Sequence, residues 1–277
     1  MTKTAFVTGA SSGIGEATVR QLIADGYQVF AAARRTDRMA PLAELGAILV
    51  PLDVTDDASM VAAIEEVRRK AGRLDLLVNN AGYGSYGALE DVAMAEGRRQ
   101  VEVNLMGLAR MCQLVLPVMR AQGSGRIINI SSMGGKIHEP FGAWYHATKY
   151  AVEGLSDCLR VEVKPFGINV VVIEPGAILT EWNKIARDGL VAASGSSDYA
   201  PYARRHAAML AGADESKMTS LPDVVARTIA KAAAARRPRA RYATGGGAGL
   251  VLFLRSILSD RLFDRLTWSI SQSPKPV

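Results

Sequence analysis

The chain has 277 residues, of which 49% are hydrophobic and 22% are charged, and it carries a net charge of +6. This length and composition fit one globular domain with a full core and exclude a disordered or fibrous chain. Four arginines at positions 236, 237, 239 and 241 hold much of the positive excess. Because no stripe of stacking aromatics accompanies them, we interpret them as a solvated helix end and loop and expect no nucleic-acid partner.

No apolar run reaches the ~18 residues of a membrane helix, and the first predicted strand begins near Thr4. We therefore expect neither a transmembrane segment nor a signal peptide, and a cytoplasmic location. Cys112 and Cys158 fall on apolar helix faces, which predicts two small core residues rather than a disulfide or redox pair. The three histidines lack the spacing of metal ligands, so no metal is expected.

The first strand, residues 4–8, runs directly into the turn GASSGIG and a helix. Gly9, Gly13 and Gly15 would let the backbone approach a pyrophosphate, and a helix beginning near Gly13 would present free N–H groups and a positive dipole end to it. Glycine-rich turns are common, but one that follows the first strand of the chain predicts dinucleotide binding.

The second predicted strand, residues 27–32, ends at Ala33, Arg34 and Arg35. A carboxylate here would repel a 2′-phosphate, whereas a guanidinium can hold it through charge-assisted hydrogen bonds. The prediction is NADP(H), preferred by roughly 10- to 150-fold. NAD is the alternative cofactor, because a loop could bring the carboxylate of Asp37 to the ribose. The alternative for the two arginines is that they are ordinary surface charges.

Two further polar positions follow predicted elements in the middle of the chain. After a helix over 35–45, the strand over 48–52 ends at Asp53, which alone is as well explained as a capping residue. After a helix over 57–71 and a strand over 74–78, a long helix over 98–120 carries Asn104 beside its apolar stripe. A buried amide costs energy unless it is bonded, so a satisfied core Asn is the alternative to a functional one.

The strand over 127–130 is followed by Ser132, and a helix over 143–163 carries Tyr145 and Lys149. A spacing of four places the phenol and the ammonium on one helix face. A phenol needs a pKa shift of about 3 units to act near pH 7, which a cation about 4 Å away can supply. The pair predicts a proton-transfer device, although an isolated pair of this kind is more often ordinary helix surface.

The sequence resembles the short-chain dehydrogenase/reductase family in four places. These are Ser132 with Tyr145 and Lys149, TGASSGIG at 8–15, NNAG at 79–82 and PGAILT at 175–180. The resemblance implies a Rossmann-like, doubly wound parallel sheet of about seven strands with flanking helices, classed as α/β. It implies a catalytic set of Asn104, Ser132, Tyr145 and Lys149. It also implies cofactor contacts from Gly9, Ser11, Ser12, Gly13, Ile14, Gly15, Arg34, Arg35, Asp53, Val54, Asn80, Ala81, Gly82, Tyr145, Lys149, Pro175, Gly176, Ile178 and Thr180.

The resemblance also implies roles. Tyr145 protonates the substrate oxygen that Ser132 holds, Lys149 lowers the Tyr145 pKa and grips the nicotinamide ribose, and Asn104 completes a proton relay through a bound water. The remaining assignments place the adenine at Asp53 and Val54, a brace for the sheet at Asn80, and the nicotinamide carboxamide at Ile178 and Thr180.

The rest of the chain is predicted to complete a single domain over 1–277, with a cofactor-binding and catalytic core over 1–180. Residues 181–220 read as a substrate lid with scattered aromatic and Met side chains. A helix over 222–235 and an edge strand over 241–244 follow. Leucines at 250, 254, 258, 262 and 266 predict an amphipathic helix in the extension over 250–277. Packing within the chain or on a partner subunit is favoured over contact with a membrane surface.

These features together predict hydride transfer between NADP(H) and a lipophilic ketone or aldehyde, such as a steroid, retinoid, fatty or aromatic carbonyl. One alternative is an NAD-dependent alcohol dehydrogenase working oxidatively. Another is a non-catalytic dinucleotide sensor, against which the presence of both Tyr145 and Lys149 counts. The family resemblance implies a homodimer or homotetramer formed through the helices over 98–120 and 143–163.

Overall fold

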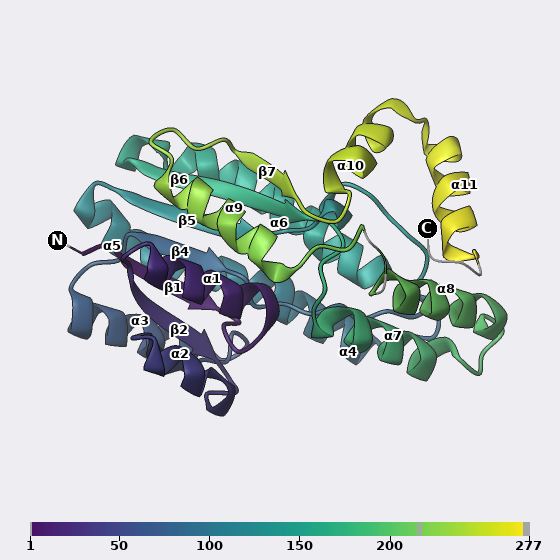
Figure 1. Ribbon diagram of the computed structural model, residues 1–277, viewed down its shortest axis with the longest axis horizontal. Helices are drawn as coiled ribbons and strands as arrows, with labels where there is room; N and C mark the ends of the chain where they lie inside the picture. The colour runs from purple at the N-terminus through teal and green to yellow at the C-terminus, as the bar shows by residue number, and fades with distance from the viewer. Residues whose placement is uncertain (1, 215, 217, 274–277) are drawn as a thin grey trace.

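The structure is a computed structural model that describes residues 2–214, 216 and 218–273. Its centre is a seven-stranded parallel sheet in the order β3-β2-β1-β4-β5-β6-β7 (Figure 1). This confirms the predicted doubly wound sheet. The strands are β1 (Thr4–Thr8), β2 (Gln28–Ala33), β3 (Ile48–Pro51), β4 (Leu76–Asn79), β5 (Gly125–Ile130), β6 (Ile168–Pro175) and β7 (Arg241–Thr244).

Helices connect and cover the strands. They are α1 (Gly13–Ala24), α2 (Ala40–Glu44), α3 (Asp57–Ala71), α4 (Met94–Val101), α5 (Gly107–Gln122), α6 (Ala143–Glu162), α7 (Glu181–Ser194), α8 (Ala200–Ala213), α9 (Pro222–Ala234), α10 (Ala248–Ile257) and α11 (Asp260–Ser271). A π-helical turn, Glu102–Met106, joins α4 to α5.

The sheet is buried on both faces, which explains why its central strands are almost uninterrupted apolar runs. One apolar core joins the sheet to α1, α2 and α9, and a second joins it to α3, α5 and α6. The strand order reverses between β1 and β4, and ligands of such sheets bind beyond the carboxyl ends of the strands at that point. Figure 1 shows α7, α8, α10 and α11 gathered beyond this end of the sheet.

The helix predicted over 98–120 is longer and less regular than expected. It begins at Met94 and widens into the π turn before α5 starts at Gly107. Gly107 lies against the loop after β3, because a Cβ added to it would stand 2.4 Å from the Val54 carbonyl oxygen. By length and composition alone the segment Met94–Gln122 would suffice to cross a membrane, which the sequence reading did not anticipate. It packs here beside α3 and α6 as a helix of the second core.

The tail differs from the single amphipathic helix that the leucine spacing predicted. It forms α10 and α11, separated by a break at Leu258 and Ser259. A four-residue repeat drifts by about 40° per step around a helix of 3.6 residues per turn, so the leucines cannot share one face. Leu262 is 50% exposed, whereas Phe263 and Ser271 are buried. Residues 274–277 of the predicted extension lie outside the described residues.

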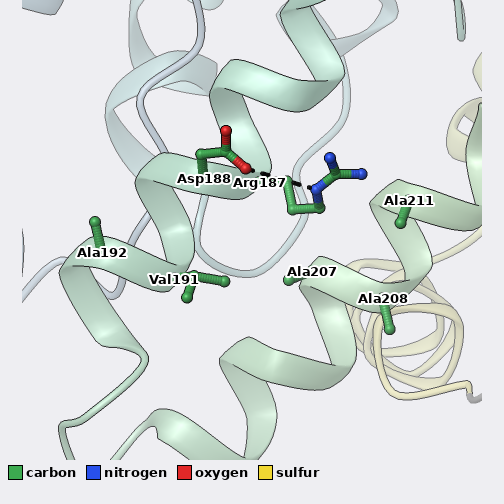
Figure 2. Close-up of a pocket in the computed structure, with 7 residues that line it drawn as sticks. All are labelled: Arg187, Asp188, Val191, Ala192, Ala207, Ala208 and Ala211. Atoms are coloured by element: carbon green, nitrogen blue, oxygen red, sulfur yellow. Dashed lines mark ion pairs between the residues drawn. The ribbon is translucent and has the colours of Figure 1, made fainter.

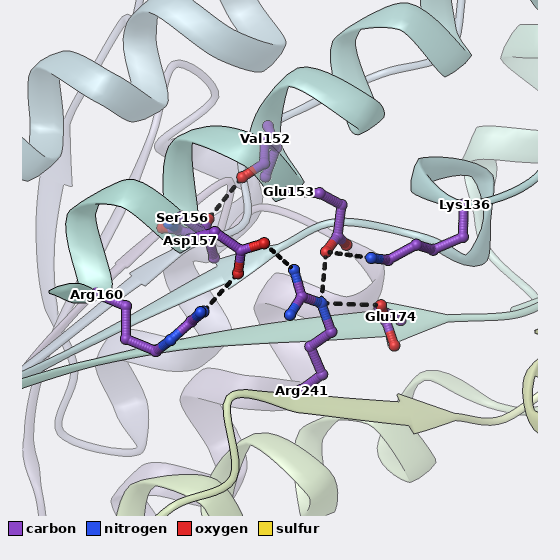
Figure 3. Close-up of polar contacts among 9 residues, drawn as sticks. Lys136, Val152, Glu153, Ser156, Asp157, Arg160, Glu174 and Arg241 are labelled. Carbon is purple, nitrogen blue, oxygen red and sulfur yellow. Dashed lines mark hydrogen bonds and ion pairs between the residues drawn. The ribbon is translucent and has the colours of Figure 1, made fainter.

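Two other sequence interpretations are corrected. Cys112 is buried as predicted, but Cys158 is exposed, because it lies on the outer side of α6. Arg241 is not part of a solvated loop: its guanidinium lies 2.9 Å from Glu153 Oε2 on α6 and 3.6 Å from Glu174 Oε1 on β6 (Figure 3). The ion pairs tie the edge strand β7 to the helix that carries Tyr145.

Candidate active site

The turn after β1 forms a cradle in which three glycines have no room for a side chain. Gly9 and Gly13 have φ angles of +68° and +55°, the left-handed region that favours glycine. A Cβ on Gly15 would stand 2.2 Å from the Gly9 carbonyl oxygen. Ser12, the N-cap of α1, makes no capping bond with its side chain, so the first N–H groups of the helix face outward for an anion. These features fit the pyrophosphate of a dinucleotide.

Polar contacts fix this turn to the tip of β4. The Asn80 side-chain amide donates to the carbonyl oxygens of Thr8 and Gly9 at 3.1 and 3.2 Å. Thr8 Oγ1 in turn accepts from the backbone N–H groups of Asn80 and Ala81, both at 3.0 Å. Asn80 therefore holds the glycine turn and the loop through Gly82 together, in line with the bracing role that the family resemblance implied.

The arginines after β2 lie beside this cradle. Arg35 Nη2 donates to Ser11 Oγ at 3.3 Å, and Arg34 is exposed next to it. Two ion pairs of Glu181 were not predicted from the sequence. Arg38 donates to its carboxylate at 2.9 Å, and Arg35 lies 3.7 Å from the same group. Glu181 belongs to the first turn of α7, so these ion pairs form a clasp between α7, the start of the predicted lid, and the expected 2′-phosphate site. The spacing of charges along the sequence could not reveal a contact across 143 residues.

Asp53 and Val54 lie at the tip of β3. The Asp53 carboxylate accepts bonds from the N–H and hydroxyl of Thr55 at 2.9 and 2.8 Å. Although burial opposes it, these bonds and the nearby Arg34 hold the pKa of Asp53 below its usual value. The residue closes a turn, and its second oxygen, Oδ2, takes no part in those two bonds.

The predicted catalytic side chains converge where β5 meets α6. Ser132 Oγ accepts from the N–H of Gly134 at 3.0 Å and donates to the carbonyl oxygen of Pro175 at 3.5 Å. Tyr145 and Lys149, each 8% exposed, project from α6 toward the same strand end. Lys149 Nζ donates to the Ile130 carbonyl oxygen at 2.9 Å and lies 5.8 Å from the centre of the Tyr145 ring.

The pKa of Tyr145 does not follow the sequence expectation. Burial raises it to about 12, the neighbouring Ser132 hydroxyl opposes the rise, and the charge of Glu139 adds to it. Burial also lowers the pKa of Lys149, to about 8, against the charge of Glu153, so most of its ammonium is still charged at neutral pH. At neutral pH Tyr145 is therefore a protonated phenol, which suits a proton donor.

Asn104 lies in the π turn and is buried. Its amide nitrogen donates to the Tyr83 carbonyl oxygen at 2.9 Å and to Thr148 Oγ1 at 3.2 Å, and its oxygen accepts from the Tyr83 N–H at 3.1 Å. The side chain is thus satisfied by protein groups next to Lys149. The proton-relay role of Asn104 stays a prediction, and π turns often occur at functional sites.

The segment after β6 closes the cofactor side of the site. Gly176 packs so tightly against the loop before α10 that a Cβ on it would stand 2.5 Å from the Gly246 carbonyl oxygen. Ile178 pairs with Ser220 in an isolated bridge. Thr180 caps α7 by accepting from the Trp182 N–H at 3.3 Å, and its methyl group lies 3.0 Å from the position of a Cβ on Gly13. The segment predicted to form the lid therefore begins against the glycine cradle.

The lid presents an aromatic wall to Tyr145. The Trp182 ring lies 5.0 Å from the Tyr145 ring, and Tyr86, which the sequence reading did not single out, lies 6.0 Å from it. A separate shallow hollow between α7 and α8, lined by Arg187, Asp188, Val191, Ala192, Ala207, Ala208 and Ala211, is shown in Figure 2. None of the predicted site residues lines that hollow.

A doubly wound sheet, a glycine cradle before a helix N-terminus, and a Ser-Tyr-Lys set at the next strand tips define an oxidoreductase that uses a nicotinamide dinucleotide. The short chain dehydrogenase family matches residues 3–190, and the protein belongs to that family.

Several known proteins are similar along most of the chain. A 3-ketodihydrosphingosine reductase of Bacteroides thetaiotaomicron is 41% identical over 172 residues, 62% of each chain. An NADPH-dependent 3-dehydrocapnine reductase of Ornithobacterium rhinotracheale is 33% identical and covers 95% of each. The crystal structure of a short-chain dehydrogenase from Streptomyces avermitilis matches with a TM-score of 0.77 at 32% identity, covering 97% of this chain and 96% of that one. Similar structures in complex with NADP and with NAD both exist.

Proposed function

We propose that the protein reduces a lipophilic ketone or aldehyde with NADPH. The observation that carries the proposal is the buried Tyr145 on the same helix as Lys149 and near Ser132, at the strand tips next to the glycine cradle. With the pyrophosphate of a dinucleotide held in the cradle, its nicotinamide would supply the hydride to the carbonyl carbon. The Ser132 hydroxyl would hold the carbonyl oxygen, and Tyr145 would deliver the proton to it. Lys149 would bind the nicotinamide ribose and return a proton to Tyr145.

The preference for NADPH is supported by charge at the end of β2. Arg34 and Arg35 are both exposed beside Ser11, and the position before them is Ala33 rather than an acidic residue. A 2′-phosphate would find two guanidinium groups there. The similar 3-dehydrocapnine reductase is named as NADPH-dependent, which agrees with this reading.

A lipophilic substrate is supported by the lid. Trp182, Tyr86 and Met209 pack with Tyr145 into one apolar cluster, so a substrate carbonyl that reaches Tyr145 must pass an apolar surface. The names of two similar proteins, a 3-ketodihydrosphingosine reductase and a 3-dehydrocapnine reductase, agree with a keto or dehydro substrate.

Assembly and location also belong to the proposal. Only 33% of the most apolar window of Met94–Gln122 is buried within the chain, and Met94, Met106 and Tyr150 are exposed on this helix and on α6. We therefore propose a homodimer or homotetramer through these helices in the cytoplasm, with light scattering and cell fractionation as tests.

The deciding experiment follows oxidation of NADPH and, separately, NADH with a panel of small and lipophilic carbonyls, for the parent chain and for Tyr145→Phe. We expect turnover with NADPH that falls by about 10²- to 10⁴-fold in the variant while NADPH binding persists. Equal rates in the two proteins would contradict the role of Tyr145. A preference for NADH would contradict the role of the arginines.

A further inference from the structure

A carboxylate stands beside the proposed proton donor, and the hydride-transfer scheme does not use it. Glu139, on the loop between β5 and α6, has a side chain that is 28% exposed. Its Oε1 accepts a hydrogen bond from the Tyr86 hydroxyl and lies 3.8 Å from His146 Nε2. The ring of Tyr86 lies 6.0 Å from the ring of Tyr145, so Tyr86 connects this carboxylate to the proposed proton donor.

Glu139 is ionised at neutral pH. Burial opposes ionisation, but His146, His206 and the Tyr86 hydroxyl together lower the pKa of Glu139 to about 2. Within the described residues, both of its polar contacts use Oε1. The second oxygen, Oε2, is therefore available to a ligand, and a carboxylate oxygen can only accept hydrogen bonds.

His206 provides an independent sign of a ligand. Its side chain, on α8, is fully buried, and its Nε2 has no hydrogen-bond partner in the described part of the chain. Its Nδ1 lies 2.9 Å from Ser271 Oγ on α11, and its ring stacks on Tyr86 with 6.0 Å between centroids. A buried ring nitrogen without a partner costs free energy, which a ligand group at this position would recover.

Aromatic rings border the same place. The hydroxyl of Tyr86 donates to Glu139. The centroid of the Tyr86 ring lies 6.0 Å from that of Tyr145 and 5.6 Å from that of Trp182, whose ring meets it edge-on. A carboxylate next to aromatic faces is the combination that binds an alkylammonium group, by ion pairing and by attraction to the rings. An anionic substituent would be repelled by the same carboxylate.

Building on the function proposed above, we propose that the substrate is an amino ketone whose ammonium group binds Glu139 while its carbonyl meets Ser132 and Tyr145. Because Tyr86 contacts Glu139 through its hydroxyl and Tyr145 through its ring, we place the amine on the part of the substrate next to the carbonyl. Glu139 would thus determine specificity, with His206 Nε2 as a further polar contact for the substrate.

The test compares two ketones with the same long alkyl chain. One is an aminomethyl ketone, and the other is the ethyl ketone in which a methyl group replaces the ammonium. With NADPH we expect kcat/KM to be at least tenfold higher for the amine, and this ratio to fall to near one in Glu139→Gln. Glu90→Gln is the matched control, because that carboxylate accepts from Tyr199 on the outer side of the lid. It should keep the parent ratio.

A binding measurement separates the two proposals. Quenching of tryptophan fluorescence by the corresponding amino alcohol, against the plain alcohol, requires no turnover. Reduction of both ketones at equal kcat/KM would overturn the amino-ketone proposal but support the reductase. The charge of Glu139 would then be compensated by His146 alone. Selective binding of the amino alcohol that Glu139→Gln abolishes, without turnover of either ketone, would support the ammonium site and refute the reductase.

Discussion

The ring of Trp182 lies 5.0 Å from the ring of Tyr145, so the first turn of α7 covers the proposed proton donor. The same indole packs onto Gly84, where an added Cβ would stand 2.4 Å from it. The position of the lid above Tyr145 therefore depends on a glycine that lies about a hundred residues earlier in the chain.

Gly84→Ala should displace Trp182. Overpacking of this kind costs about 1 to 3 kcal/mol, and we expect kcat/KM for a ketone to fall by about tenfold because the wall of the site moves. Gly154→Ala is the matched control: nothing lies within 4 Å of its Cβ position on α6, so it should stabilise the protein by about 0.5 to 1 kcal/mol. Urea unfolding and ketone kinetics measure both effects. Parent kinetics in Gly84→Ala would show that Trp182 does not shape the site.

Glu181→Gln should strengthen NADPH binding. The carboxylate competes with a 2′-phosphate for Arg35, and its ion pairs with Arg35 and Arg38 are about half exposed. Exposed pairs contribute about 0.2 to 1 kcal/mol, so the Kd for NADPH should fall up to about fivefold while that for NADH stays constant. Glu65→Gln, which breaks an exposed pair with Arg68 on α3, is the control. Equal effects on the two cofactors would place the 2′-phosphate elsewhere.

Arg241→Met should destabilise the protein strongly. It removes the nearer of two cations beside the buried carboxylates of Glu153 and Glu174 and leaves Lys136, 3.7 Å from Glu153 (Figure 3). Breaking a buried pair costs about 3 to 5 kcal/mol. Burial and the neighbouring Glu153 already raise the pKa of Glu174, so the deficit should shrink as the pH falls and the carboxylates take up protons. Arg239→Met, beside Tyr242 at the surface, should have little effect. Thermal melts at several pH values test this, and a deficit that does not vary with pH would count against it.

Lys149 should make folding stability depend on pH in the alkaline range. Its pKa is lowered from 10.5 to about 8 in the folded chain, so the unfolded chain binds more protons between these values. Stability then rises with pH across this window. Relative to Lys149→Met, the parent should gain about 1 to 2 kcal/mol between pH 8 and pH 9.5 in urea titrations. A difference that stays flat would mean that the ammonium is not desolvated.

Much of this architecture follows from local patterns. Three elements have the predicted bounds, because their apolar periodicity and the turn residues at their ends indicate the same limits. They are strand Thr4–Thr8, helix Asp57–Ala71 and strand Arg241–Thr244. The glycine cradle and the Ser132, Tyr145 and Lys149 set could be expected because short sequence spacings determine them. The roles of these residues stay predictions.

The remaining features depend on contacts between distant segments. Three contacts join elements that no local sequence pattern relates. They are the ion pair of Glu181 with Arg38, the hydrogen bond of Tyr86 to Glu139, and the ion pair of Arg241 with Glu153. The raised pKa of Tyr145 has the same origin, because burial is a property of the whole fold.

The helix α11 touches both walls of the substrate region: Asp264 Oδ1 lies 2.8 Å from His138 Nε2 beside Glu139, and Ser271 lies against His206 on α8. Neither contact involves the glycine cradle or the arginines after β2. If the proposed function holds, sequence change in this last helix can alter substrate choice without touching the residues expected to hold the nucleotide. An exchange of tails between homologues would then transfer selectivity without transferring cofactor choice.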